Sequence, residues 1–256
     1  MKALFAFTKK EFLYQIRSGK LTLLGIIFLL FGILNPAVAK LTPWLLEAMA
    51  DSLAESGMTI NEITVTALDS WVQFFKNMPM ALIIFILAES SIFTLEYRSG
   101  TLILSLTKGL HRHKTLISKT TVLYTLWTVG YWFCFAITYA YNAYFWDNSI
   151  AQNLVFSVVA WWIFGLWVIS LVTLFSTVFT SNSNVLTATA AIVLLSYIIS
   201  IFPKISEYMP TLLADGNSLI YAKTTPDTYF SALAVTIITG ITALVLSVPI
   251  FNKKQL

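Results

Sequence analysis

The chain has 256 residues, of which 57% are hydrophobic and only 11% are charged. A typical soluble domain carries about 25% charged residues, so this composition excludes an ordinary water-soluble globular fold. The net charge of +4 could suggest a nucleic-acid-binding protein. The basic residues, however, lie in short segments beside long apolar stretches, which is the pattern of a polytopic membrane protein. We therefore expect the lipid bilayer, and no nucleic acid, as a partner.

Residues 2–18 carry too many charges to cross a membrane. Phe5, Phe12 and Ile16 recur at helical spacing on one face, and basic residues flank that face. This pattern predicts an amphipathic interfacial helix that lies in the headgroup region. The alternative is a positive flank that only orients the next segment.

Six long apolar segments can each cross a hydrocarbon core of about 30 Å as a helix. The predicted spans are 21–39, 78–95, 115–145, 151–180, 185–202 and 229–251. The predicted fold class is therefore an all-α integral membrane protein, with one transmembrane domain over residues 1–256. Because further spans follow the first one, we expect that segment to be retained and not cleaved as a signal peptide.

Residues 40–76 separate the first two spans, and we expect them to form an extracellular helical hairpin that rests on the membrane. Thr42 and Pro43 are typical of the start of a helix, and Gly57 and Asn61 mark an end and a second start. The segment has more acidic than basic residues, which favours the outer side. The acidic residues are Glu47, Asp51, Glu55, Glu62 and Asp69.

The distribution of basic residues predicts that both termini are cytoplasmic. With six spans and an internal N-terminus, most of the 16 Lys and Arg residues fall on the inner side. The outer ones are Lys40, Lys76, Lys204 and Lys223. The positive-inside rule thus predicts a multi-pass membrane protein with both termini in the cytoplasm.

Glu89 is the only acidic residue well inside a predicted span. A carboxylate there costs about 2.5–3.5 kcal/mol on insertion scales, so it should face protein or water. Glu96 follows seven residues later, which places both on one helix face about two turns apart. Two interpretations stay open: a polar contact at the cytoplasmic mouth of a translocation path, or a carboxyl group neutralised by a neighbour in the bundle.

Aromatic residues crowd the outer halves of the third and fourth spans. An interfacial belt explains most of them. Two tyrosines, Tyr131 and Tyr139, are in addition candidates for lining a translocation path.

Residues 96–119 join the second and third spans and contain five of the basic residues. Gly100 can end the preceding helix in a left-handed conformation, and Ser99 or Thr101 can cap the next one. The pattern predicts a short helix over about 101–107, rigidly placed and flanked by basic residues that suit an acidic or polar partner surface.

Metal and nucleotide sites are not expected in this chain. His111 and His113 are two residues apart, so on a helix they would point to different faces, and no Cys, Asp or Glu is near them. Cys134 lies alone in an apolar segment. A Walker phosphate loop is also absent, because Gly19 and Lys20 are followed by leucine instead of Ser or Thr. We therefore expect no enzyme activity and no cofactor in this chain, and an energy source in a partner or an ion gradient.

The order of an acid, Gly-Thr, an apolar run, a helix break and basic residues resembles the permease subunits of ABC-2 type ABC transporters. The matching positions are Glu96, Gly100, Thr101, Leu102, Leu104, Leu106, Arg112 and Lys119. The basic N-terminal helix and the six spans fit the same outline. Gly109 departs from the family, which more often has proline there, although either residue breaks a helix.

The resemblance implies a permease subunit of the bacterial inner or plasma membrane. Such a subunit pairs with a second copy or a related permease, and with ABC ATPase subunits that bind ATP and Mg²⁺. Residues 98–112 would form the coupling region, seated in a cleft of the ATPase. The implied coupling residues are Glu96, Arg98, Gly100, Thr101, Leu102, Leu104, Leu106, Lys108, Gly109 and Arg112. Because intramembrane charge is scarce, we expect export of a hydrophobic or amphipathic substrate, such as a peptide, toxin or drug.

Two other classes stay open. A secondary transporter driven by an ion gradient would use Glu89 as the carrier, but such proteins are expected to have mid-membrane acids in both halves. A membrane scaffold or membrane enzyme would need no ATPase partner. Co-purification with an ATPase would separate these classes.

Overall fold

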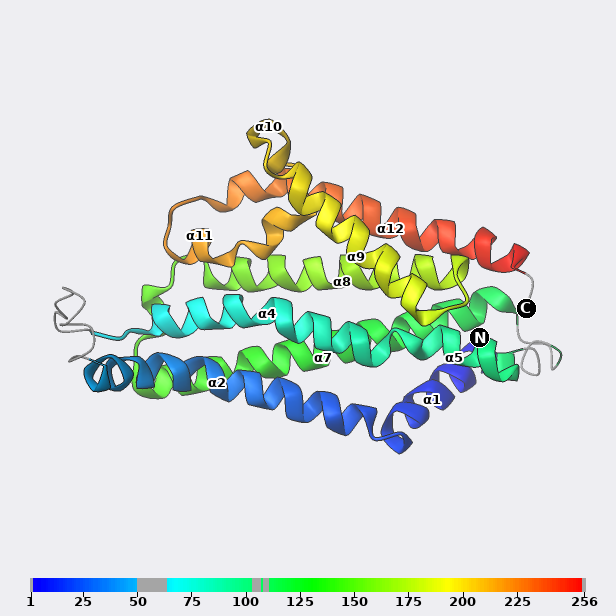
Figure 1. Cartoon of the computed structure of the whole chain (residues 1–256), viewed down its shortest axis with the longest axis horizontal. Helices are drawn as coiled ribbons and strands as arrows, with labels where there is room; N and C mark the ends of the chain where they lie inside the picture. Colours follow the sequence, from blue (N-terminus) through cyan, green and yellow to red (C-terminus); the bar gives the residue numbers. More distant parts are fainter. Residues whose placement is uncertain (1, 50–63, 103–106, 108–110, 255–256) are drawn as a thin grey trace.

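The computed structural model describes residues 2–49, 64–102, 107 and 111–254, and in this part of the chain all regular structure is helical. Six helical segments are long and apolar enough to cross a membrane, which confirms the predicted fold class. These segments are Lys20–Leu45, Ala67–Tyr97, Arg112–Phe145, Leu154–Val178, Asn182–Ile199 and Pro226–Lys253. Figure 1 shows an elongated bundle with both chain termini at the same end, which we call the terminal end. The opposite end is the far end.

The long helices form two sides of one bundle. They are α2 (Lys20–Ala48), α4 (Ala67–Glu89), α7 (Arg112–Phe145), α8 (Leu154–Val178), α9 (Asn182–Ile199) and α12 (Phe230–Lys253). α2 packs against α4 and α7 on one side, whereas α8 packs against α12 and α9 on the other. α7 also contacts α8 and so joins the two sides.

Glycines let these helices approach closely. A Cβ atom on Gly165 of α8 would lie 2.3 Å from the ring of Trp127 in α7. A Cβ atom on Gly130 of α7 would lie 2.4 Å from the ring of Phe28 in α2. Neither position can hold a larger residue unless an aromatic ring moves. The aromatic core thus depends on small residues, as is common where membrane helices pack.

α2 continues well beyond residue 39, where the first span was predicted to end. Thr42 and Pro43 lie inside this helix instead of starting a new one, and the Thr42 hydroxyl donates to the carbonyl of Val38 at 2.8 Å. A proline removes one backbone donor, but packing and side-chain hydroxyls compensate for that loss in membrane helices. The prolines of α2 therefore mark no helix boundary.

α4 begins at Ala67, before the predicted start of the second span at residue 78. Thr66 and Asp69 form a capping box at this end, in which the Thr66 backbone N–H donates to the Asp69 carboxylate at 2.8 Å. The flanks of the predicted hairpin over residues 40–76 are therefore the ends of α2 and α4. The middle of that hairpin, residues 50–63, lies outside the described residues.

A buried amide ties three helices together towards the far end. Asn35 of α2 has no exposed surface. Its Nδ2 donates to the Thr138 hydroxyl of α7 at 3.1 Å, and its Oδ1 accepts from Asn77 of α4 at 2.9 Å. The Thr138 hydroxyl donates in turn to the Gly32 carbonyl at 3.1 Å. This chain of hydrogen bonds fixes the register of α2, α4 and α7.

The N-terminal helix α1 (Lys2–Arg17) forms where the sequence predicts a helix over 2–18. It packs against α7 and α2. Phe7, Glu11 and Gln15 recur every four residues and are buried, whereas Phe5 and Ile16 are 75% and 56% exposed. α1 thus has a buried face as well as the exposed apolar face that the sequence pattern singled out. Its position in the headgroup region stays a prediction.

Residues 203–229 connect α9 to α12 and fold into short helical elements over the far end of the bundle (Figure 1). They are α10 (Pro203–Ser206), η2 (Pro210–Ala214), α11 (Gly216–Ile220) and η3 (Pro226–Tyr229). Trp161 of α8 donates to the Ala214 carbonyl at 3.0 Å. Tyr229 donates to the Asp215 carbonyl at 2.9 Å. The first bond holds the segment against α8, and the second links η3 to the N-cap of α11.

Candidate functional site

A buried cluster of charges joins three elements at the terminal end. Lys119 of α7 lies 3.0 Å from Glu11 of α1 and 3.1 Å from Glu96 of α5 (Ser91–Ser99). Lys10 lies 2.8 Å from Glu96 and 3.1 Å from Glu11. Lys119, Glu11 and Glu96 are 2%, 3% and 8% exposed. Two cations thus balance two carboxylates, and we call these four residues the buried charge cluster.

The two lysines of the charge cluster differ in their surroundings. Lys119 also donates to the Ile92 carbonyl at 2.9 Å, which anchors α5 to α7. Partial burial by itself would lower the pKa of Lys10. The hydrogen bond to Glu96 and the charges of Glu11 and Glu96 outweigh that burial, so the pKa of Lys10 lies above its ordinary value.

Glu89, at the end of α4, faces α1 and the start of α2. Its side chain has no exposed surface, and its Oε2 accepts from Nε2 of Gln15 at 2.6 Å. Lys20 lies 3.8 Å from the same oxygen and donates to the Ala88 carbonyl at 2.7 Å. Glu89 therefore has a nearby cation and a hydrogen-bond donor within the bundle. A role for Glu89 in translocation stays a prediction.

Sequence reasoning missed the contribution of α1 to this end of the bundle. Glu89 and Glu96 were singled out, but Glu11 and Gln15, which pair with their surroundings, were not. One signal was available: Phe7, Glu11 and Gln15 share a helix face apart from that of Phe5 and Ile16. A carboxylate that recurs with a phenylalanine on one face indicates burial beside a basic partner.

A second polar arrangement at the terminal end holds the carboxyl ends of α8 and α12. Arg112, the first residue of α7, donates to the carbonyls of Phe251, at 2.9 Å, and Lys254. Lys254 donates to the carbonyl of Phe179 at 2.7 Å and lies 4.1 Å from the ring centre of Tyr97. Cations at these positions satisfy carbonyls that have no partner within a helix. The predicted coupling residue Arg112 thus also caps α12.

The predicted coupling region is described only in part. Gly100 ends α5 with a φ of 68°, the left-handed conformation expected from the sequence. Thr101 is exposed and Leu102 is buried, and Ser99 Oγ lies 2.8 Å from Thr101 Oγ1. The side chain of Arg98 and all of Leu104, Leu106, Lys108 and Gly109 lie outside the described residues.

His111 lies just before α7, and its ring stacks on that of His113 with 5.4 Å between the ring centres. The two rings therefore share one side, whereas the sequence spacing had predicted different faces. The difference arises because His111 has extended backbone at the N-cap and is not part of the helix.

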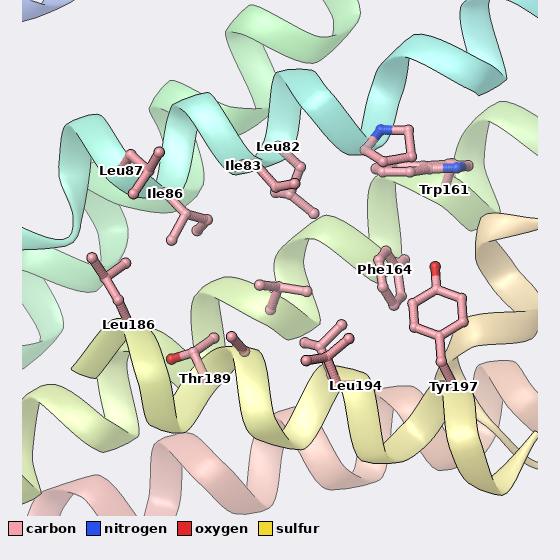
Figure 2. Close-up of a pocket in the computed structure, with 14 residues that line it drawn as sticks. Leu82, Ile83, Ile86, Leu87, Trp161, Phe164, Leu186, Thr189, Leu194 and Tyr197 are labelled. Atoms are coloured by element: carbon pink, nitrogen blue, oxygen red, sulfur yellow. The ribbon is translucent and has the colours of Figure 1, made fainter. Parts of the chain in front are cut away.

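An apolar groove of about 410 Å³ runs between α4 and α9 and is partly open to the surroundings. Figure 2 shows Leu82, Ile86 and Leu87 of α4 across from Leu186 and Leu194 of α9, and Phe164 of α8 also lines the groove. The volume falls in the range of about 300–1,000 Å³ that is usual for pockets that bind small molecules. We call this feature the α4–α9 groove.

The two tyrosines predicted for a translocation path lie elsewhere. Tyr131 has no exposed surface, and its hydroxyl donates to the Val158 carbonyl at 2.8 Å within the core. Tyr139 is 45% exposed and packs against Trp71 and Phe135. Neither lines the α4–α9 groove. Their role in transport stays a prediction.

Six helices that are long and apolar enough to cross a bilayer indicate a multi-pass membrane protein. The chain belongs to the ABC-2 transporter family, because the family model described as "ABC-2 family transporter protein" matches residues 5–251. This finding confirms the resemblance seen in residues 96–119. No curated protein matches the chain. Membership implies a permease role with a separate ABC ATPase partner, and a permease subunit is generally not itself catalytic.

Proposed function

We propose that the chain is the permease subunit of an ATP-driven exporter for a hydrophobic or amphipathic substrate, such as a peptide, toxin or drug. The observation that carries this proposal is the α4–α9 groove, whose lining is almost wholly apolar. It lies between two helices that are long and apolar enough to span the bilayer. An apolar chain can enter such a groove without leaving any buried polar group unpaired.

The second permease copy covers the open side of the groove in this proposal. The open side of the groove carries large apolar residues that the chain itself leaves exposed: Leu87 of α4 and Leu194 of α9 are 57% and 60% exposed. A twofold partner that packs on this side would close the groove into an enclosed path. Either a homodimer or a pair with a related permease would do so.

The ATPase partner binds ATP and Mg²⁺ and contacts residues 98–112 from the cytoplasm, with both termini on the same side. Two features support this arrangement. The termini lie at one end of the bundle, as an even number of spans requires. The wall of the groove formed by α4 leads through α5 directly to Gly100, so a displacement of the coupling region is transmitted to the groove.

Blocking the groove tests the transport path. Ala190 lines the groove from α9, whereas its neighbour Ala191 is equally exposed and does not. Ala190→Trp is expected to abolish ATP-dependent extrusion of a hydrophobic dye from cells, while Ala191→Trp keeps it. Equal activity of the two variants, at equal amounts of membrane protein, would place the path outside the groove.

Isolation of the protein from its native membrane tests the partner. An ABC ATPase chain is expected to co-purify and to be identified by mass spectrometry. Gly100→Pro, which cannot adopt a φ of 68°, is expected to lose that chain. Gly25→Ala, at a helix position with open space around it, is expected to keep it. Wild-type protein that carries no ATPase would favour the scaffold or ion-driven alternatives.

A further inference from the structure

A second cavity adjoins the α4–α9 groove at the far end. It has a volume of about 200 Å³, and Tyr197 lines both the groove and this cavity. Its other described lining residues are Ser200, Ser206, Thr211, Leu212 and Asp215. An apolar groove therefore leads to a partly open cavity edged by hydroxyl groups and one carboxylate, an arrangement that suits an amphiphile with a long apolar body and a polar head. We call it the head-group cavity.

Three side chains of this cavity, those of Ser200, Ser206 and Asp215, present lone pairs to a ligand instead of protons. The hydroxyl of Ser200 donates to the Tyr197 carbonyl at 2.7 Å, and that of Ser206 donates to the Pro203 carbonyl at 2.8 Å. Since both protons are used, the two oxygens can only accept from a ligand. Asp215 adds a carboxylate, whose oxygens accept from Ser218 and keep further lone pairs.

Thr211 gives an independent sign of a missing partner. Its side chain is 5% exposed, and its hydroxyl oxygen is buried without a hydrogen-bond partner. A buried hydroxyl normally finds a partner, because leaving it unpaired costs about 1–3 kcal/mol. Thr211 lies in the wall of the cavity, so a polar group that occupies the cavity can supply that partner.

The charge of the residues that line the cavity determines which charge a ligand should carry. Of the described residues that line it, Asp215 is the only charged one. Lys204 and Glu207 of the neighbouring α10 segment are exposed and do not line the cavity. A chamber with one carboxylate and several acceptor oxygens complements a group with positive charge and several N–H donors.

We propose that the head-group cavity binds the primary ammonium group of a cationic amphiphile whose apolar chain occupies the α4–α9 groove. The inference rests on the proposed function and deepens it by naming the substrate class as alkylamines and peptides with a basic end. The site lies at the far end of the groove, so it holds the head group on the side of the membrane opposite the termini.

Photolabelling of the full chain in nanodiscs tests this proposal. The probes are dodecylammonium and dodecyl sulfate, each with a diazirine at the tip of the chain, and labelled peptides are identified by mass spectrometry. Both are expected to label groove residues of α8 and α9. The ammonium probe is expected to reach half-saturation at a concentration about tenfold lower, the effect of one hydrogen-bonded charge pair.

Two variants test the preference for the ammonium probe and are expected to keep the fold. Asp215→Asn keeps a side chain that caps α11, because asparagine caps helices as well as aspartate does. Thr211→Val removes a hydroxyl that makes no internal bond. Asp215→Asn is expected to abolish the preference for the ammonium probe, and Thr211→Val to weaken ammonium binding severalfold. Asp227→Asn, an exposed residue outside the cavity, serves as the control and keeps the preference.

The outcomes separate the two proposals. If both probes label the groove with equal half-saturation in wild-type protein, the head-group cavity does not recognise an ammonium group, and the transport path still stands. If neither probe labels α8 or α9, no apolar chain enters the groove, and both proposals are overturned.

Discussion

Lys119 of α7 and Glu11 of α1 meet at 3.0 Å inside the protein, where each side chain is almost completely removed from solvent. A pair so buried is strongly destabilised when one partner is removed, because the other charge stays behind without compensation. α1 is therefore an integral part of the bundle and not only an attachment to its surface. The lysine also lies 3.1 Å from Glu96, so the same ammonium group ties α1 to the element that leads to the coupling region.

Lys119→Met is expected to lower the free energy of unfolding by about 3 kcal/mol or more, since it leaves two buried carboxylates with Lys10 alone. Thermal unfolding of the purified protein in detergent measures the loss. Lys114→Met, at a half-exposed position of the same helix, is the matched control. Similar small losses in both variants would mean that solvent reaches the cluster and screens its charges.

Asn35→Ala is expected to destabilise the protein by about 1–2 kcal/mol, because it leaves Thr138 and Asn77 without their shared partner. A double-mutant cycle with Asn77→Ala measures the coupling between the two amides. The cycle is expected to be non-additive, because the second substitution removes a bond that the first has already broken. Additive losses would show that the two residues act independently.

Gly100→Ala is expected to cost about 1–2 kcal/mol at the end of α5, because a φ of 68° brings a Cβ atom too close to the backbone. The strain is relieved if the helix end rearranges, which would misplace the coupling region. We therefore expect reduced ATPase stimulation and reduced export at normal protein levels. The Gly25→Ala variant, in open space within α2, should show neither effect.

Glu89→Gln is expected to keep both the fold and export, because the amide oxygen still accepts from Gln15. A dye-extrusion assay in cells, with protein levels checked by immunoblot, measures this. Loss of export with an unchanged unfolding temperature would instead favour the ion-driven alternative, in which Glu89 carries a proton.

Burial of the ammonium group lowers the pKa of Lys254 to about 8, whereas an unfolded lysine has a pKa of about 10.4. Between these values the unfolded state binds more protons than the folded state, so the free energy of unfolding rises with pH. Below pH 8 both states are protonated and this dependence disappears. The difference in unfolding temperature between wild-type protein and Lys254→Met is expected to grow from pH 8 to 10, in favour of the wild type. A difference that stays constant over this range would contradict the lowered pKa.

The spans could be predicted from the sequence because apolar length is a local property. The ends of α2 and α4 could not, since the cost of Pro43 inside a helix is offset by packing that no local pattern records. The left-handed glycine at position 100 was predictable because only glycine readily tolerates that backbone conformation. The first and last turns of the spans therefore depend on tertiary contacts.

Less of the candidate functional site than of the fold could be predicted from the sequence. Glu89 and Glu96 stand out as acids in apolar surroundings, but their partners come from α1, far away in the chain. The groove depends on how α4 and α9 are set against α8, and the head-group cavity depends on the fold of residues 203–229. The hydrophobic periodicity of a single segment cannot predict how separate helices are placed relative to one another.

The two walls of the groove differ in how firmly they are held. α4 packs against α2 and continues into α5, and Lys119 of α7 donates a hydrogen bond to α5. In contrast, α9 is largely exposed and contacts chiefly α8. In the proposed exporter, a displacement of residues 98–112 would move α4 together with α2 and α7, while α9 would stay with α8. The α4 wall of the groove would then move relative to the α9 wall. We expect spin labels on α4 and α9 to change their separation during the ATP cycle, and labels on α4 and α7 to keep theirs.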